Sequence, residues 1–211
     1  MNLNVSNRDV SIINIAEELY LVVACDSLGA IGDKERDIVK VPPYVSGRFT
    51  CRVPLMELIS VGAVPKALTA TICNEPVPTG ESILAGIRDE LIKTGLDIPI
   101  TISTEKNMPT CQTGLGVTII GICRKDELRI NTTHIGDKLY CVGIPKVGNE
   151  VDLEDPEIPD GRLVSDLLKL LFVQDIIPVG SKGIKGEADM LTAALGLSVR
   201  WSEDLNVDIN K

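Results

Sequence analysis

Residues 19–29 read LYLVVACDSLG, a continuous apolar run of strand length that ends in an acidic, glycine-bearing stretch. An apolar run of this length, bounded by turn residues, predicts a buried β-strand. Since the run stops at Asp26, we expect this carboxylate to lie on the loop that leaves the strand. The sequence therefore predicts a buried sheet with an acidic side chain at its edge.

The chain on the C-terminal side of this run alternates between strand and helix patterns. Leu55, Leu58 and Ile59 recur at helical spacing, with Pro54 near the expected helix start and Gly62 able to close the helix. The other elements expected up to residue 123 are strands at 67–73, 99–103 and 116–123 and a helix at 80–94, with Thr79 as its N-cap and Gly95 at its C-terminal end. This alternation predicts an α/β or α+β fold.

The pattern changes after residue 131, where we place the boundary between a first domain, residues 1–131, and a shorter second one, residues 132–211. The elements expected in the second domain are a strand at 139–144, a helix from about 161 to 171 with Asp160 as its N-cap, and a helix at 187–195 closed by Gly196. About 75 residues make only a marginal core, so we expect a shortened C-terminal α/β unit.

The composition favours a soluble protein with an aliphatic core. Hydrophobic residues make up 44% of the 211 positions and aromatic residues only 3%, so aliphatic side chains must fill the interior. The formal charge of −9 and the lack of an arginine cluster interleaved with aromatics disfavour nucleic-acid binding. The longest apolar runs fall short of the roughly 20 residues that span a bilayer, and the N-terminus does not resemble a signal peptide. We therefore expect a cytoplasmic protein with no membrane partner.

The six cysteines are far apart in the sequence, with no C-x-x-C pair, and the chain has a single histidine. This spacing disfavours a zinc site. Because four of the six lie inside or beside apolar runs, we interpret them as buried free thiols in a reducing compartment. A redox-active or nucleophilic cysteine is the alternative.

Two glycine-rich segments do not match the common nucleotide motifs. The segment at 114–119 lacks the third glycine of a dinucleotide fingerprint and leads into a strand, and the segment at 180–183 lacks the spacing of a Walker loop. Both are interpreted as turns. If this chain binds ATP, it does so without a P-loop or a Rossmann motif.

Three separated carboxylates are candidate ligands for a hard divalent cation, namely Asp26, Glu57 and Glu105. Proteins that bind ATP-bound magnesium supply a few carboxylates, and the phosphates supply other ligands. Each also has an ordinary explanation: Asp26 as a turn residue, Glu57 as an exposed helix residue and Glu105 as a solvated loop charge.

Two segments resemble the N-terminal ATP-binding domain of the aminoimidazole ribonucleotide synthetase (PurM-like) superfamily. Residues 22–26 read VVACD and residues 57–65 read ELISVGAVP, similar to that family's aspartate-ended strand and its helix that runs from an acid to Gly-Ala-x-Pro. Residues 103–105 take the place of its Gly-Gly-Asp/Glu-Thr-like loop, and residues 136–143 resemble the opening of its C-terminal domain. Here Glu57 replaces the usual aspartate, and Ile102-Ser103 replaces the glycine pair. The resemblance covers most of residues 15–145.

The resemblance implies a mostly antiparallel or mixed sheet flanked by helices, and an ATP and Mg2+ site. Asp26 and Glu57 would carry the catalytic role, and Asp26, Glu57 and Glu105 would be the metal ligands. The residues implied to bind ATP are Asp26, Lys34, Thr104, Glu105, Lys106 and Asn107. For Lys34 and Lys106, a solvated surface role is the alternative.

Residues 78–81 and 103–107 are most similar to short proteins related to α-ribazole kinase of cobamide salvage, a branch of cobalamin biosynthesis. The implied activity is transfer of the γ-phosphate of ATP to a nucleoside-like hydroxyl such as that of α-ribazole. The alternatives are an ATP-dependent synthetase or ligase of the same superfamily and a non-catalytic nucleotide-binding partner protein. The resemblance also implies a homodimer, and a segment at residues 5–15 that folds over the nucleotide.

Overall fold

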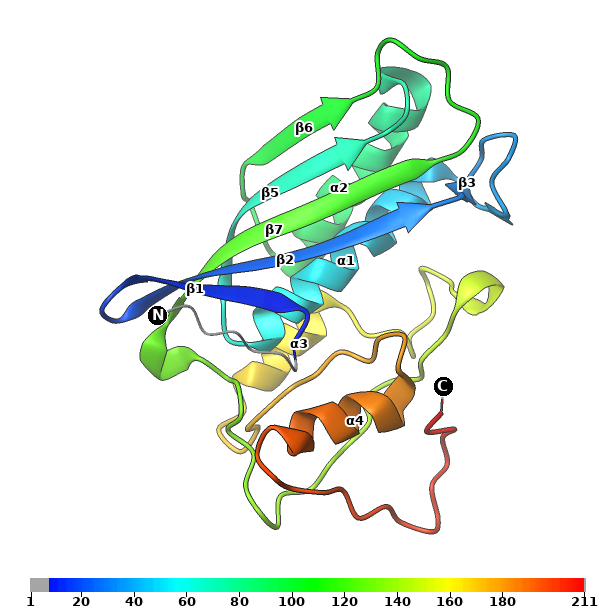
Figure 1. The fold of residues 1–211 in the computed structure, drawn as a ribbon. Coiled ribbons are helices and arrows are strands. Elements are labelled where there is room, and N and C mark those ends of the chain that lie inside the picture. The colour runs from blue at the N-terminus through cyan, green and yellow to red at the C-terminus, as the bar shows by residue number, and fades with distance from the viewer. Residues whose placement is uncertain (1–7, 211) are drawn as a thin grey trace.

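The computed structural model describes residues 8–210 and has a five-stranded mixed sheet with helices packed on one of its faces (Figure 1). In their order across the sheet, the strands are β1 (Val10–Ala16), β2 (Leu19–Gly29), β7 (Gly114–Arg124), β5 (Val64–Ile72) and β6 (Ile100–Thr104). Neighbouring strands are antiparallel except for β5 and β6, which are parallel. The predicted fold class, with a mixed sheet flanked by helices, is confirmed.

The remaining elements are short strands, helices and single turns. These are β3 (Ile31–Gly32) and β4 (Val39–Lys40), which form a parallel pair, the helices α1 (Pro43–Ser60), α2 (Glu81–Thr94), α3 (Gly161–Leu168) and α4 (Gly183–Ala193), and the turns η1 (Pro76–Gly80), η2 (Lys125–Glu127) and η3 (Gly148–Glu150).

Strand β2 is longer than its apolar run. Its backbone pairs with β7 residue by residue as far as Gly29, which lies opposite Gly114. Asp26 is therefore inside the strand, opposite Val117, and the expectation that it lies on the loop leaving the strand is wrong. The polar residues stay in the ladder because β7 continues to supply hydrogen-bond partners, and pairing depends on the backbone rather than on side-chain polarity.

Helix α1 begins eleven residues before the expected start. Its first residue is Pro43, which follows Pro42 at the N-cap, and Pro54 is inside the helix. A proline at the first position is tolerated because the N–H that it lacks would have no helical partner there. Sequence periodicity located the end of α1 but not its start, since Pro54 resembles a start signal.

Helices α1 and α2 pack closely against each other and share a buried ionic cluster. A Cβ atom added to Gly86 of α2 would lie 2.1 Å from the backbone oxygen of Tyr44, so only glycine fits at this crossing. Glu90 is fully buried in α2, and its carboxylate accepts hydrogen bonds from Arg48 at 2.7 Å and from Arg52 at 2.7 and 3.1 Å. These contacts fix the helix layer that covers the sheet.

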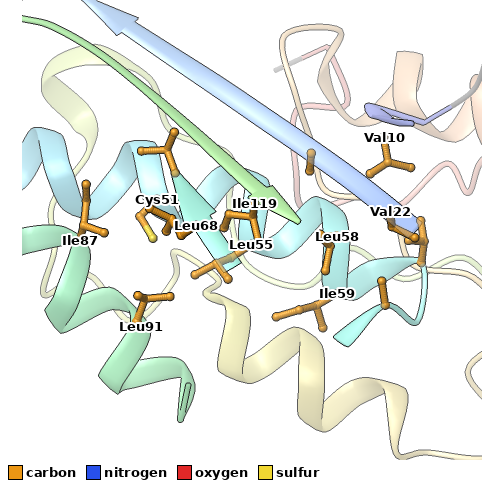
Figure 2. Close-up of a cluster of buried hydrophobic side chains, with 14 of the residues drawn as sticks. Val10, Val22, Cys51, Leu55, Leu58, Ile59, Leu68, Ile87, Leu91 and Ile119 are labelled. Atoms are coloured by element: carbon orange, nitrogen blue, oxygen red, sulfur yellow. The ribbon is translucent and has the colours of Figure 1, made fainter. Parts of the chain in front are cut away.

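The core lies between this helix layer and the sheet and is mainly aliphatic (Figure 2). Leu55 and Leu58 of α1 pack against Val22 of β2 and Ile119 of β7, and all four side chains are fully buried. Along β2 the side chains alternate between buried and half-buried, because the helices cover only one face of the sheet. The opposite face carries half-exposed residues.

Residues 125–210 contain α3, α4 and two short turns, and no strand. The strand expected at 139–144 is therefore absent, and Tyr140 there is 80% exposed. A strand needs a neighbour for its backbone, and the backbone hydrogen bond found in this stretch runs from Ile144 to Glu157, at 2.9 Å. Helix α3 packs on α1 through the buried Val164, and its predicted N-cap is confirmed, since Asp160 accepts from the Leu163 N–H at 2.9 Å. The domain boundary at residue 131 stays a prediction.

The cysteines are free thiols, but most are not buried. Cys51 and Cys123 are buried, and burial raises the pKa of both thiols. The other four, Cys25, Cys73, Cys111 and Cys141, are exposed, so the prediction that four of the six are buried is wrong. Proximity to an apolar run failed as a signal because one face of the sheet is open. Among residues 8–210, no helix is long and apolar enough to cross a membrane.

Candidate functional site

Asp26 is half-buried on the helix-covered face of the sheet. It follows Val22 and Ala24 in the alternation of β2, and the side chains of both pack in the core. Burial raises the pKa of Asp26, and a hydrogen bond from the backbone of Ser27 partly opposes this. Within residues 8–210, its carboxylate has no hydrogen bond to a lysine or arginine. Asp26 is thus an unpaired carboxylate beside the core.

Glu57 lies on α1 and is only 8% exposed. Burial is the main reason that its pKa rises to about 8, and the neighbouring acids Asp9 and Glu187 raise it further, whereas Arg8 lowers it. No donor in the described part of the chain makes a hydrogen bond to its carboxylate. The alternative interpretation of Glu57 as an exposed helix residue is therefore wrong. Helix α1 packs against the sheet on one side and against α3 on another.

Glu105 follows β6 at a half-exposed position, and its carboxylate binds the backbone of its own loop. Its carboxylate accepts from the backbone N–H groups of Asn107, at 2.6 Å, and Met108, at 3.1 Å, which lowers the pKa of Glu105. Thr104 ends β6 and is half-buried, while Lys106 and Asn107 are exposed on the loop. A shallow groove of about 240 Å3 lies beside this loop, between the ends of β5 and β6. The groove is lined by Thr71, Ile72, Cys73, Ser103, Thr104 and Glu105.

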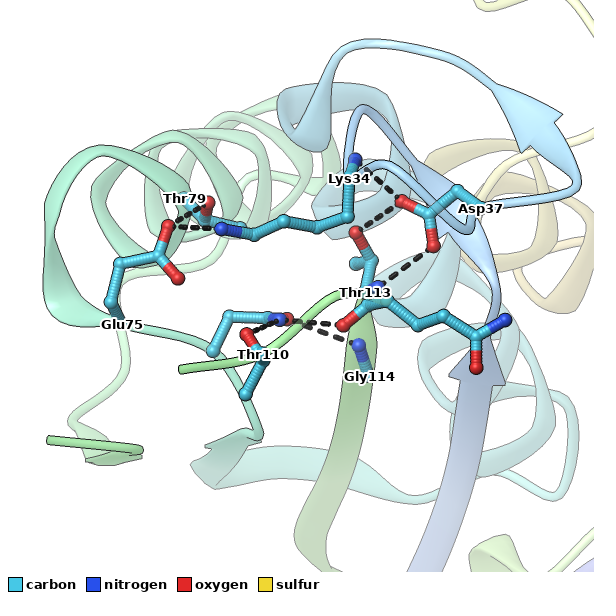
Figure 3. Close-up of polar contacts among 9 residues, drawn as sticks. Lys34, Asp37, Glu75, Thr79, Thr110, Thr113 and Gly114 are labelled. Atoms are coloured by element: carbon cyan, nitrogen blue, oxygen red, sulfur yellow. Dashed lines mark hydrogen bonds and ion pairs between the residues drawn. The ribbon is translucent and has the colours of Figure 1, made fainter. Parts of the chain in front are cut away.

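Lys34 is held by a carboxylate instead of facing solvent freely. Its Nζ donates to Glu75 at 2.5 Å, and the same Glu75 oxygen accepts from Thr79 (Figure 3). Burial acts to raise the pKa of Glu75, but the hydrogen bonds from Lys34 and Thr79 outweigh it, so the pKa is lowered. Thr79 therefore does not cap α2 as expected, since its hydroxyl is used by Glu75 and the N-cap residue is Gly80.

A second set of hydrogen bonds fixes the loops around Lys34 (Figure 3). The buried Asp37 accepts from the backbone N–H and the hydroxyl of Thr113, both at 2.7 Å, and from the backbone N–H of Lys34 at 2.9 Å. Asn74 donates to the Thr110 hydroxyl and accepts from the Gly114 N–H. The loops after β3, β5 and β6 thus form one connected rim at this end of the sheet.

The three predicted metal ligands do not converge. Strand β2, which carries Asp26, and strand β6, which precedes Glu105, are three strand spacings apart. At about 4.8 Å per spacing, their backbones are roughly 14 Å apart. Among residues 8–210, no group of three or more Asp, Glu, His or Cys side chains is close enough to hold a metal ion. Asp26 lies on the helix-covered face of β2 and Glu57 lies on α1, and neither is among the groups that shift the pKa of the other, whereas Glu105 lies at the far edge of the sheet.

The structure brings a different acid to Glu57. Asp9 directly precedes β1, whose first residue Val10 pairs with Ala24, two residues before Asp26. Asp9 is also close enough to Glu57 to raise its pKa. The sequence contains only a weak indication that Asp9 lies near Glu57, because a single acid before an alternating stretch is common. Of the segment at residues 5–15 expected to fold over a nucleotide, residues 5–7 lie outside the described residues.

Asp26 and Glu57 offer carboxylate oxygens, which are the kind of ligand that magnesium takes. Magnesium takes oxygen ligands and is usually held by one or two carboxylates, with phosphates and water completing its shell. Glu57 is buried and Asp26 is half-buried, neither with a hydrogen-bonded cation within residues 8–210, and burying such groups unpaired is costly. Residues whose pKa is perturbed by burial are frequent at functional sites.

No protein-family model matches this sequence, and no curated protein sequence matches it. The chain is similar in structure to thiamine monophosphate kinase from Aquifex aeolicus, with 16% identity and a TM-score of 0.42 over 58% of this chain and 39% of that one. It is also similar to thiamine-monophosphate kinase from Stenotrophomonas maltophilia K279a, with 20% identity and a TM-score of 0.42 over 58% and 37%. A third similar structure is Thermotoga maritima PurL complexed with ADP, with 15% identity and a TM-score of 0.42 over 58% and 21%. The chain thus spans 21 to 39% of the length of these proteins.

Proposed function

We propose that this chain binds magnesium-ATP and acts as a small-molecule kinase that transfers the γ-phosphate to a nucleoside-like hydroxyl. The observation that carries the proposal is the state of Asp26 and Glu57, two carboxylates at the helix-and-sheet interface without a hydrogen-bonded cation. They are also two of the three acids that the sequence resemblance assigns to the metal. A chain of net charge −9 needs such a cation to accept a triphosphate.

In this proposal Asp26 and Glu57 hold the magnesium ion, which neutralises phosphate charge when it is bound. Thr104, Lys106 and Asn107 contact the nucleotide from the loop after β6. Glu105 was predicted as a third ligand, but its carboxylate already binds the backbone of its own loop, so we place it outside the metal shell. The chain's own contribution to phosphoryl transfer is then positioning and charge stabilisation.

Lys34 is proposed as a phosphate-binding residue that must first exchange partners. Its ammonium group is engaged by Glu75, and both side chains are partly exposed, at 19% and 32%. An exposed or half-exposed ion pair contributes little free energy, so a triphosphate can compete for the lysine.

The acceptor that we propose is a nucleoside such as α-ribazole, and the product identifies the reaction. A panel of nucleosides that includes α-ribazole is incubated with γ-labelled ATP, magnesium and the full chain. A kinase transfers the label to a nucleoside, whereas a synthetase or ligase releases it as inorganic phosphate, and a non-catalytic binding protein leaves ATP intact. Label transfer that is lost in Asp26→Asn supports the proposal, and ATP left intact with every nucleoside contradicts it.

We also propose that two copies associate through the open face of the sheet. This face carries the half-buried Leu21, Val23, Ile120 and Ile122, and the exposed Val64 at its edge. Aliphatic side chains that no helix covers favour burial against a partner. Sedimentation at micromolar concentration is expected to give a dimer that Val23→Glu dissociates, and a wild-type monomer would contradict it.

A further inference from the structure

Arg8 forms a buried ion pair that joins distant parts of the chain. Its Nη2 donates to Asp175 Oδ1 at 2.9 Å and its Nη1 donates to the Ile176 backbone oxygen at 2.7 Å. The two side chains are 1% and 2% exposed. The other oxygen of Asp175 accepts from the backbone N–H groups of Thr132 and Thr133 and from the Thr133 hydroxyl, each at 2.8 Å. One carboxylate therefore connects three segments, those before β1, after β7 and after α3.

This arrangement leaves one donor and one acceptor unsatisfied in the same neighbourhood. The Nε of Arg8 is buried and has no hydrogen-bond partner within residues 8–210. Glu57, only 8% exposed, accepts no hydrogen bond from these residues, and it is close enough to Arg8 for the two charges to interact. A buried polar group without a partner destabilises the fold, so a state that pairs Arg8 with Glu57 gains free energy that partly offsets the lost contact with Asp175.

The other acids near Arg8 are less suited to be its second partner. Glu187 of α4 accepts hydrogen bonds from the backbone of Gly180 and Lys182, which occupy its carboxylate. Asp9 is exposed and therefore solvated. Glu57 is the buried acid with free acceptor capacity, and a guanidinium can form the same forked contact with either carboxylate.

We propose that Arg8 is an exchangeable clasp. In the state described here it holds Asp175, and in a second state it pairs with Glu57 and releases the segments 130–134 and 172–178 from the start of β1. Two carboxylates then compete for one guanidinium, and the competition sets how tightly the C-terminal half docks. The inference does not depend on nucleotide binding and is tested without nucleotide.

Removing the competitor is the direct test. Hydrogen exchange followed by mass spectrometry is compared between the wild type and two variants, Glu57→Gln, which removes the ionisable carboxyl group, and Glu57→Met, which also removes the acceptor. If the released state supplies about nine tenths of the openings through which 130–134 and 172–178 exchange, its loss should slow exchange there about tenfold. Exchange in the α2 core at 83–91 serves as the reference for a change in global stability, and Glu81→Gln, on the exposed first turn of α2, is the matched charge-removal control.

A permanent ion pair gives a different result. Exchange in 130–134 and 172–178 that is unchanged or faster relative to the reference in both variants would overturn the proposal. A further variant, Asp175→Asn, removes the other partner of Arg8 and also distinguishes an exchangeable clasp from a permanent ion pair. The exchangeable clasp predicts faster exchange in those two segments while residues 8–14 keep their protection, because Arg8 then pairs with Glu57. Loss of protection at 8–14 to the same degree contradicts it.

Discussion

Residues 10–124 and residues 125–210 are held together by different kinds of contact. The first region has a continuous five-stranded ladder under a helix layer, so most of its backbone groups bond within the sheet or a helix. The second has two helices and no strand, and large apolar side chains such as Leu171 and Phe172 are 94% and 78% exposed there. Its attachment depends on a few side chains, mainly Asp160, Val164 and Asp175. We infer that the first region unfolds as a unit and that the second can loosen without it.

The largest effect is expected from the buried ionic cluster in the first region. Glu90→Gln leaves Arg48 and Arg52 buried beside a neutral group, and breaking a buried pair typically costs about 3–5 kcal/mol of unfolding free energy. Urea denaturation should show this loss in all signals from the first region at once. As a control, Asp126→Asn, at an exposed ion pair with Arg124, should change the unfolding free energy far less, because solvent screens this pair. Similar effects of both changes would contradict the importance of the cluster.

The next effect is a dependence of stability on pH that originates at Glu57. Its pKa of about 8 in the folded state exceeds the ordinary value of 4.5, so the folded chain binds the extra proton between these values. The contribution of Glu57 to the unfolding free energy is therefore largest below about pH 4.5. It falls as the pH rises toward 8, by at most about 1.4 kcal/mol per pH unit. Urea midpoints at pH 5, 6, 7 and 8 measure the slope. Glu57→Gln should flatten it, and an unchanged slope in that variant would place its origin elsewhere.

A smaller and more local effect is expected in the second region. Asp160→Ala removes the N-cap of α3 and its ion pair with Lys93, and the loss of such a cap costs about 0.5–2 kcal/mol. Hydrogen exchange should become faster in 161–171 and stay unchanged in β2. If β2 exchanged faster to the same extent, the two regions would form one cooperative unit and the comparison above would fail.

The sequence predicted the sheet region well because its signals are local. Strands at 67–73, 99–103 and 116–123 carry apolar runs between turn residues, and each overlaps an observed strand. Gly95 closes α2 in the left-handed conformation, with φ +79°, as its position after the last helical residue indicated. Such signals need no knowledge of distant residues.

Three of the failures concern partners far away in the chain. The stretch 139–144 has strand propensity but no neighbouring strand, and local propensity cannot supply one. The pairing of Arg8 with Asp175 spans 167 residues, and nothing near either residue indicates the other. For the same reason the sequence proposed Glu105 beside Asp26, although the order of the strands keeps them apart.

The central claim is that Asp26 and Glu57 hold magnesium-ATP, and calorimetric titration of ATP into the full chain tests it most directly. With magnesium present, the account predicts saturable binding that weakens at least tenfold, or about 1.4 kcal/mol, in both Asp26→Asn and Glu57→Gln. Glu105→Gln, on the exposed loop at the far edge of the sheet, should bind nearly as the wild type does. Affinity that is unchanged in Asp26→Asn, or binding that is equally strong without magnesium, would contradict the account.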